Sequence, residues 1–387
     1  MLKSPTAFHL TNAWVVTPDA VQERSSVTIR DGFIVAVGGD CPRNMHELDL
    51  GGQLLMPGIV DLHCDAIEKE VEPRPKVPFP LPFAVTQCDR RNAAAGITTI
   101  YHSVSFASGE LGVRSVATAG DLVRAIRAHH PHGLVDNRTH CRFEVTDGDA
   151  APVIAALIDD DMVDLLSLMD HSPGQGQFRR PEDYIAYLGR TYHIPAAEAA
   201  VITQRKLAGR GPAWERARDL ATTALKAGVP IASHDDDSPA RVAEMIALGV
   251  SISEFPTDID TAHAARAAGI SVLVGAPNAL RGRSQGGHLR AEDALRAGAA
   301  DCLCADYAPA AMLPAALRLV DIGVLDLPRA AAVVASNPAR AAGLADRGRI
   351  APGLRADLVA VDARPGRHHA TATWVVGRLA YRSEYPT

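Results

Sequence analysis

The sequence has few aromatic residues and little excess charge. Phe, Trp and Tyr make up 5% of its 387 residues, which argues against a platform for stacking nucleic-acid bases. Asp and Glu outnumber Lys and Arg by 45 to 39, and a net charge of −6 does not suit a surface that grips nucleic acid. No apolar run approaches the ~20 residues needed to cross a bilayer. We therefore expect neither a nucleic-acid nor a membrane partner.

Cysteine is also sparse. The six cysteines are scattered along the chain without the spacing of a zinc ribbon, so reduced and mostly buried thiols are the simplest interpretation. The first residues lead into a short alternating segment and lack the apolar stretch of a signal peptide, from which we expect a cytoplasmic location.

What the chain does have is enough apolar material for a large core. Hydrophobic residues make up 47% and charged residues 22% of the sequence, which is typical of a globular protein. The length fits two or three domains, or one large α/β barrel with an appendage. Fifteen histidines are the one unusual feature of the composition.

Both ends of the chain resemble short β-strands. Apolar runs alternate with turns between Phe8 and Val37, and Asp31-Gly32 between two such runs is a typical hairpin signal. The run from Asp357 to Leu379 has the same character. Neither end is long enough to hold a core alone, so we predict that residues 1–56 and 349–387 together form one small β-sandwich domain.

Between the ends, residues 57–348 alternate short β-rich runs with Ala- and Leu-rich helical stretches, which is typical of parallel βαβ units. Eight strands suit a TIM-type (β/α)8 barrel, whose usual size is ~250 residues. The polar stretch Gly174–Ala213 predicts an insertion over the barrel mouth, before a helix that starts at Trp214. The predicted strands are Ile59–Asp65, Ile97–Val104, Arg138–Val145, Asp164–Met169, Val229–Ser233, Val250–Ser253, Ser271–Val274 and Asp301–Ala305.

Metal-ligating residue types stand where these strands end. In a barrel the carboxyl ends of all strands meet on one face, where active sites are built. A lone histidine there is more often a hydrogen-bonded structural residue, and a lone aspartate is as often a helix cap. Six donors at the ends of five strands are harder to explain in that way. The candidates are His63, Asp65, Glu144, His171, His234 and Asp306.

Imidazole and carboxylate ligands suit Zn²⁺ in the first place, with Mn²⁺ or Fe²⁺ as alternatives. Six donors exceed one tetrahedral site, so we expect two divalent ions bridged by Glu144. Such a pair, ~4 Å apart, holds a hydroxide and polarises the group that it attacks. Asp306 is then the catalytic residue that takes the hydroxide's proton.

Other residues of this region have less direct interpretations. Glu254 ends its own strand and is a candidate for supporting a ligand, and His140 lies within a strand, where packing outweighs ligation. Five cations in the loops after the strands are candidates for binding phosphate, although each alone is more often a solvated surface charge. These substrate-binding candidates are Lys69, Arg74, Arg179, Arg281 and Arg283.

Several runs resemble a known family. Met56-Pro57-Gly58-Ile59-Val60-Asp61-Leu62-His63 is similar to the first-strand signature of the amidohydrolase superfamily. The run Ser167–Gln175 and the runs that begin at Ala232 and Glu254 resemble its phosphonate-degradation branch, which belongs to the C–P lyase pathway.

This resemblance implies a metallo-dependent hydrolase barrel with a two-metal site, in which Asp65 replaces a histidine and Glu144 replaces a bridging lysine. It also implies cleavage of the α–β phosphoanhydride of α-D-ribose 1-methylphosphonate 5-triphosphate, or a close analogue, with release of pyrophosphate.

Two other functions stay open from the residues alone. The same metal ligands serve an amidohydrolase that cleaves a C–N bond, such as a cyclic amide hydrolase or a deaminase. A metal-free structural barrel is a third interpretation, which the six competent donors disfavour. The loop arginines and the resemblance favour phosphorus chemistry and a phosphorylated sugar as the small-molecule partner. Whether copies of the chain form a homo-oligomer is left open.

Overall fold

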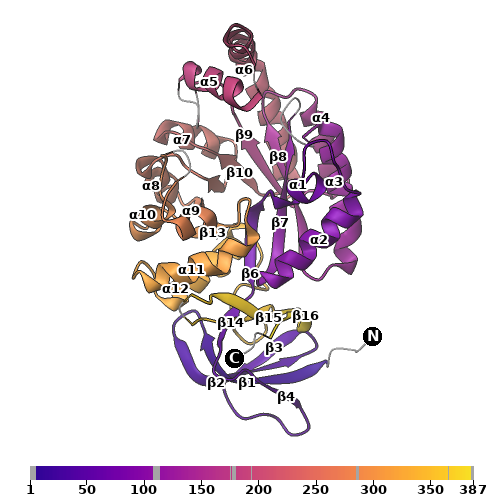
Figure 1. The fold of residues 1–387 in the computed structure, drawn as a ribbon, viewed down its shortest axis with the longest axis vertical. Helices are drawn as coiled ribbons and strands as arrows, with labels where there is room; N and C mark the ends of the chain where they lie inside the picture. Colours follow the sequence, from indigo (N-terminus) through magenta and orange to yellow (C-terminus); the bar gives the residue numbers. More distant parts are fainter. Residues whose placement is uncertain are drawn as a thin grey trace.

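The computed structural model describes residues 6–107, 114–174, 176, 180–192, 194–284, 287–364 and 366–384. These residues form two eight-stranded sheets. One is a parallel barrel surrounded by helices, and the other is a mostly antiparallel sheet built from both ends of the chain, drawn below the barrel in Figure 1.

The barrel strands follow one another around the sheet in chain order, and every neighbouring pair in the ladder is parallel. All eight lie where the sequence predicts a strand, with ends shifted by a few residues. Their interior positions are almost continuously buried, as expected of parallel strands covered by helices. The strands are β6 (Ile59–Cys64), β7 (Ile97–Phe106), β8 (Asp136–Glu144), β9 (Leu165–Met169), β10 (Ile231–His234), β11 (Ile252–Glu254), β12 (Ser271–Gly275) and β13 (Cys302–Cys304).

The helices lie between the strands and cover the outside of the barrel (Figure 1). Ser238 and Asp258 begin α7 and α8 by accepting a hydrogen bond from the backbone three residues later. The helices are α1 (Ala66–Val71), α2 (Leu81–Ala94), α3 (Val116–His129), η1 (His130–His132), α4 (Ala150–Asp159), α5 (Pro181–Tyr192), α6 (Ala196–Lys226), α7 (Pro239–Ala247), α8 (Ile259–Ala267), α9 (Ala276–Arg281), α10 (Ala291–Arg296), η2 (Pro309–Ala311), α11 (Met312–Asp321), α12 (Leu327–Val334) and α13 (Ser336–Ala341). Within the described ranges, no helix combines the length and hydropathy needed to span a membrane.

One helix prediction is wrong. The helix predicted to start at Trp214 begins at Ala196 and runs through Pro212, so most of the stretch taken for a polar insertion is helical. Proline interrupts one backbone hydrogen bond but does not always end a helix, and here the helix continues on both sides. The described insertion also contains α5, which packs on α6 through a small cluster around Tyr184, Leu188 and Ala199.

The second sheet joins the two ends of the chain. Its central pairing is antiparallel between β5 and β14, with Leu55 opposite Ala360. The predicted Asp31-Gly32 hairpin is confirmed: both residues have positive φ, 50° and 85°, as a tight hairpin turn requires. The strands are β1 (Ala7–Val16), β2 (Val21–Arg30), β3 (Phe33–Val37), β4 (His46–Asp49), β5 (Leu54–Pro57), β14 (Leu358–Asp362), β15 (His369–Val375) and β16 (Arg378–Arg382).

The predicted terminal β-domain is thus present, with its strands connected into one continuous sheet. The division of the chain at residues 56 and 349 into two folding units stays a prediction.

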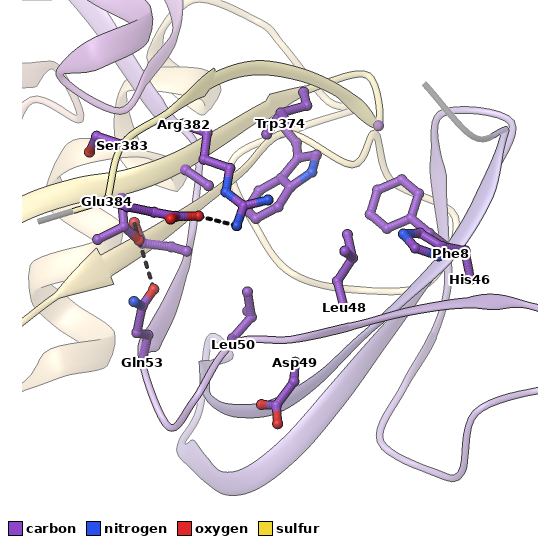
Figure 2. A pocket seen from close by; sticks show the side chains of 15 residues that line it. Phe8, His46, Leu48, Asp49, Leu50, Gln53, Trp374, Arg382, Ser383 and Glu384 are labelled. Carbon is purple, nitrogen blue, oxygen red and sulfur yellow. Dashed lines mark hydrogen bonds and ion pairs between the residues drawn. The ribbon is translucent and has the colours of Figure 1, made fainter. Parts of the chain in front are cut away.

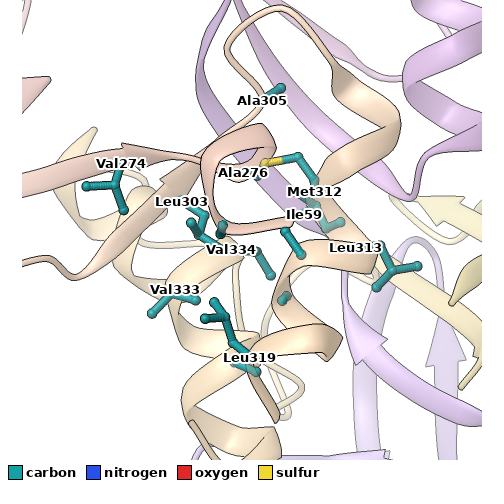
Figure 3. Close-up of a cluster of buried hydrophobic side chains, with 14 of the residues drawn as sticks. Ile59, Val274, Ala276, Leu303, Ala305, Met312, Leu313, Leu319, Val333 and Val334 are labelled. Atoms are coloured by element: carbon teal, nitrogen blue, oxygen red, sulfur yellow. The ribbon is translucent and has the colours of Figure 1, made fainter. Parts of the chain in front are cut away.

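The barrel is held to its helices by an apolar core. Figure 3 shows part of it, where Ile59 of β6 and Leu303 of β13 face Met312 and Leu319 of α11 and Val334 of α12. These side chains are at most 1% exposed. Each fully buried side chain of this size contributes ~1.5–3 kcal/mol to stability. The packing fixes the first and last barrel strands relative to each other.

The barrel closes through a bridge between Cys64, at the end of β6, and Asp306, two residues after β13. Asp306 N donates to His63 O at 2.8 Å, and Asp65 N donates to Asp306 O at 2.9 Å. Asp306 has φ +55°, a left-handed conformation that aspartate tolerates and that often marks functional sites. Closure therefore brings Asp306 beside the predicted ligands of the first strand.

Candidate metal centre

Three predicted ligands gather at the carboxyl edge of the barrel. The imidazole rings of His63 and His234 are stacked with centroids 5.5 Å apart, and His171 meets His234 edge-on at 5.8 Å. Burial is the main factor that lowers the pKa of His63 and of His234 to about 3. Both rings are therefore neutral near pH 7, which is the form that binds metal.

Two groups of donor atoms have the spacing of a metal site. One contains His63, His234 and Glu254, and the other contains His171, His234 and Asp235, with donor atoms within 4.8 Å of one another. His234 belongs to both groups. Glu254 and Asp235 were not among the predicted ligands. The signal for Asp235 was its place directly after His234, and that for Glu254 was its place at the end of β11.

Glu254 connects two of the histidines. Its Oε1 lies 2.9 Å from His63 Nδ1, and its Oε2 lies 3.2 Å from His234 Nδ1. Because a carboxylate only accepts hydrogen bonds, both Nδ1 atoms donate and both Nε2 atoms are left as acceptors. Glu254 is completely buried, so this arrangement is shielded from water. The expected supporting role fits Glu254 better than direct ligation does.

Glu144 lies beside the third histidine. Its Oε2 is 3.0 Å from His171 Nδ1, and its Oε1 accepts from Thr146 Oγ1 at 2.6 Å. Asp235 Oδ2 is 4.0 Å from His171 Nε2 and 3.9 Å from His234 Nε2. Asp235 thus faces the Nε2 atoms of both His171 and His234. The predicted bridging role of Glu144 stays a prediction.

Asp65 and Asp306 lie next to each other but outside the two groups found among the described residues. Asp65 Oδ2 is 3.5 Å from Arg142 Nη1 and 3.8 Å from Arg114 Nη2. Burial, followed by the charge of Asp65, raises the pKa of Asp306 to about 7. A carboxyl group with that pKa exchanges a proton readily near neutral pH, as a general base or acid must.

Within the described ranges, no hydrogen bond or ion pair joins the predicted substrate-binding cations to this cluster. Lys69, Arg74, Arg281 and Arg283 are all exposed, and Arg179 lies outside the described residues. Lys69 lines a cavity of about 540 Å³ between α1, α2 and η2. The cations beside the candidate ligands are Arg114 and Arg142. Sequence reasoning missed Arg142 because it looked for arginines only in loops, whereas Arg142 lies within β8.

The terminal sheet contains a separate cavity of about 600 Å³. Figure 2 shows Phe8, Leu48 and Trp374 on its wall, with an ion pair between Arg382 and Glu384 at one side. None of the candidate ligands lines it. The concentration of histidines and carboxylates therefore marks the barrel mouth, not this cavity, as the candidate active site.

A parallel barrel with histidines and carboxylates at its carboxyl edge defines the class of metal-dependent TIM-barrel hydrolases. Comparison with known proteins agrees. A family model described as "Amidohydrolase family" matches residues 218–380. The alpha-D-ribose 1-methylphosphonate 5-triphosphate diphosphatase of Escherichia coli (strain K12) is 35% identical over 362 residues, which cover 92% of this chain and 96% of that protein. The chain belongs to the amidohydrolase family and is a hydrolytic enzyme.

Solved structures share the fold at low identity. N-acetylglucosamine-6-phosphate deacetylase from Pasteurella multocida is 13% identical with a TM-score of 0.65, and the match covers 96% of this chain and 99% of that one. Dihydropyrimidinase from Brevibacillus agri is 14% identical with a TM-score of 0.55, over 97% of this chain and 95% of that one. These matches establish the architecture.

The family is metal-dependent, and the residues of this chain fit a metal. Neutral, buried imidazoles with their Nε2 atoms free lie beside carboxylates, and this is the donor set that Zn²⁺ and similar ions use. The carboxylates also outnumber the nearby cations: Asp65, Glu144, Asp235, Glu254 and Asp306 accompany Arg142 and Arg114. Divalent ions would balance this excess negative charge.

Proposed function

We propose that the enzyme hydrolyses the α–β phosphoanhydride of α-D-ribose 1-methylphosphonate 5-triphosphate, or of a close analogue, and releases pyrophosphate. The observation that carries this proposal is the 35% identity to the E. coli diphosphatase over 92% of the chain. A phosphorylated sugar is then the small-molecule partner.

We further propose two divalent ions, zinc in the first place with manganese or iron as alternatives. His63, Asp65, Glu144, His171, His234 and Asp306 remain the proposed ligands, and the geometry adds Asp235 as a donor. When bound, such ions polarise a phosphoryl oxygen and lower the pKa of water.

The chain's own residues would prepare this chemistry. Glu254 fixes the rings of His63 and His234 so that their Nε2 atoms face the site. Because the pKa of Asp306 is raised to about 7, part of its population is deprotonated near neutral pH, and this form can accept a proton from the attacking water and later return it to the leaving group. Glu254 is fully buried and Asp306 is partly buried, and charges in such settings interact more strongly than in water.

A hydrolysis screen tests the proposal. The purified protein, loaded with zinc or with manganese, is incubated with ribose 1-methylphosphonate 5-triphosphate, ordinary nucleoside triphosphates and cyclic amides, and released pyrophosphate and ammonia are measured. We expect pyrophosphate from the ribose triphosphate at the highest kcat/KM. Chelator-treated protein is the control, and added metal should restore its activity. Ammonia release or ring opening of a cyclic amide, without pyrophosphate release, would instead identify a C–N hydrolase.

A further inference from the structure

Arg142 is a buried cation at the candidate active site. It lies in β8 between His140 and Glu144, and alternate residues of a strand point to the same face. That face is the barrel interior, because His140 and Glu144 contact Glu254 and His171 there. Arg142 itself is 6% exposed.

The guanidinium group has few partners for a buried arginine. Within the described part of the chain its hydrogen bond is from Nη1 to Asp65 Oδ2, at the long distance of 3.5 Å. Its Nε is fully buried and has no acceptor among the described residues. A guanidinium carries several N–H donors, and buried charged groups are normally paired and hydrogen-bonded. Arg142 therefore has donor capacity that the protein leaves unused.

The unused N–H donors of Arg142 lie close to the residues proposed to carry out the reaction. Asp65, its partner, is hydrogen-bonded through its backbone to Asp306. The charge of Arg142 also acts on His63, His234 and Asp235, which surround the same space. A substrate whose reacting group lies between the histidines and Asp306 would bring its neighbouring oxygens to this guanidinium.

We propose that Arg142 binds the phosphate oxygens of the substrate and thereby selects a multiply charged phosphoanhydride over an uncharged amide. The proposal rests on the proposed function and names the residue that recognises its substrate class. Arginine suits this role because its planar fork can make two parallel hydrogen bonds to a phosphate, which the ammonium group of lysine cannot do. The four predicted loop cations that the structure describes are exposed, so solvent screens them more strongly than it screens Arg142.

Binding of inorganic pyrophosphate, the expected product, tests this role separately from turnover. Calorimetric titration compares the zinc-loaded wild type with Arg142→Gln and Arg142→Lys. Metal content is measured before and after each titration, and the thermal unfolding midpoint is recorded. Arg124→Gln is the matched control, because Arg124 lies on the exposed side of α3 and pairs with Asp121.

We expect Arg142→Gln to weaken pyrophosphate binding by roughly 10- to 100-fold, as for the loss of hydrogen bonds to a charged group. Arg142→Lys should recover part of the affinity, and Arg124→Gln should match the wild type. Metal content should be the same in all four proteins.

Three results would overturn the proposal: wild-type affinity in Arg142→Gln, no pyrophosphate binding by the wild type, or metal loss in Arg142→Gln that parallels its loss of affinity. The last would mean that Arg142 only positions Asp65. The proposed function fails separately, if the wild type binds pyrophosphate through Arg142 but does not hydrolyse the ribose triphosphate.

Discussion

Strand β8 has buried charged residues at both of its ends. The two ends differ in which groups face those charges. Asp136 begins the strand at the amino edge of the barrel, and Arg142 and Glu144 lie at the carboxyl edge. At the amino edge each buried charge faces an opposite charge. At the carboxyl edge carboxylates face one another, and the buried arginine has spare donors.

The amino edge resembles a structural clamp. Asp136 Oδ2 accepts from Arg138 Nε at 3.1 Å and from Arg347, which also donates to Thr99 Oγ1 at 2.9 Å. Burial alone would raise the pKa of Asp136. The charges of Arg138 and Arg347 nevertheless hold this pKa below its usual value. Because Arg347 follows the last barrel helix, this network ties the end of the barrel to its second and third strands.

At the carboxyl edge the carboxylates are only partly balanced by cations: Asp65 faces Arg142 and Arg114. Asp306 lies close to Asp65, Asp235 and Glu254, and burial with these neighbours raises its pKa to about 7. Such an arrangement costs stability unless a cation or a substrate joins it. The contrast teaches that burial of charge does not by itself identify a functional site. What distinguishes the carboxyl edge is an excess of carboxylates over nearby cations, together with a buried arginine whose Nε has no acceptor among the described residues.

The largest effect should come from Asp306→Asn. The amide cannot take up a proton, so kcat for the ribose triphosphate should fall by roughly 10²- to 10⁴-fold, the usual contribution of general acid–base catalysis. Metal content, measured by mass spectrometry, should stay nearly unchanged. Asp293→Asn, an exposed change on α10, is the control. Unchanged turnover in Asp306→Asn would remove its role as the base.

Asp136→Asn should lower the stability of the protein and leave kcat almost unchanged, the reverse of the effect expected for Asp306→Asn. Removing one partner of a buried ion-pair network leaves Arg138 and Arg347 undercompensated, at a cost of roughly 3 kcal/mol in the free energy of unfolding. Urea denaturation measures this cost, and kcat should remain close to that of the wild type. The control Asp121→Asn breaks an exposed pair and should cost under ~0.5 kcal/mol. A large loss of kcat in a stable Asp136→Asn protein would contradict the division between the two edges.

Glu254→Gln tests whether the carboxyl edge is organised for metal. The amide replaces one carboxylate oxygen by a donor, so it can accept from only one of the two Nδ1 atoms. We expect metal affinity to fall roughly 10- to 100-fold, measured by competition with a chelator. In the cobalt-substituted protein the visible absorption spectrum should also change. Glu244→Gln on the exposed side of α7 is the control. Wild-type affinity and spectrum would show that Glu254 has no positioning role.

The same contrast explains which parts of the fold and of the candidate site could be predicted from the sequence. Local patterns of β-rich runs, followed by helical ones in the barrel, predicted the eight barrel strands and the sheet built from both chain ends. The structure contains both features. His63, His171 and His234 were predicted as candidate ligands because each stands at a strand end. Glu254 was considered only as a support, and its contact with two histidines depends on the register of β11 against β10, which no local pattern specifies.

Arg142 was missed for a related reason. An arginine inside a strand gives no sign of whether it reaches solvent or the barrel interior, and Arg138, four residues earlier, belongs to the structural network. The start of α6 was predicted wrongly because Pro212 and the polar residues before it have a composition typical of a loop. For Arg142 the deciding contact is with Asp65, a residue distant in the sequence.

The smallest effect should come from the double change Arg281→Ala and Arg283→Ala. Both side chains are exposed beside the end of α9, and neither contacts a candidate ligand among the described residues. Exposed charges contribute only ~0.2–1 kcal/mol to a pairing, so KM for the ribose triphosphate should rise a few-fold with little change in kcat. KM for an uncharged amide, where one is turned over, should not change. Raising the salt concentration should remove the difference, because it screens exposed charges far more than buried ones. If the double change raises KM for the ribose triphosphate as much as Arg142→Gln does, the loop arginines recognise the phosphates. If KM rises equally for the ribose triphosphate and for the uncharged amide, the loop arginines have no role in phosphate binding.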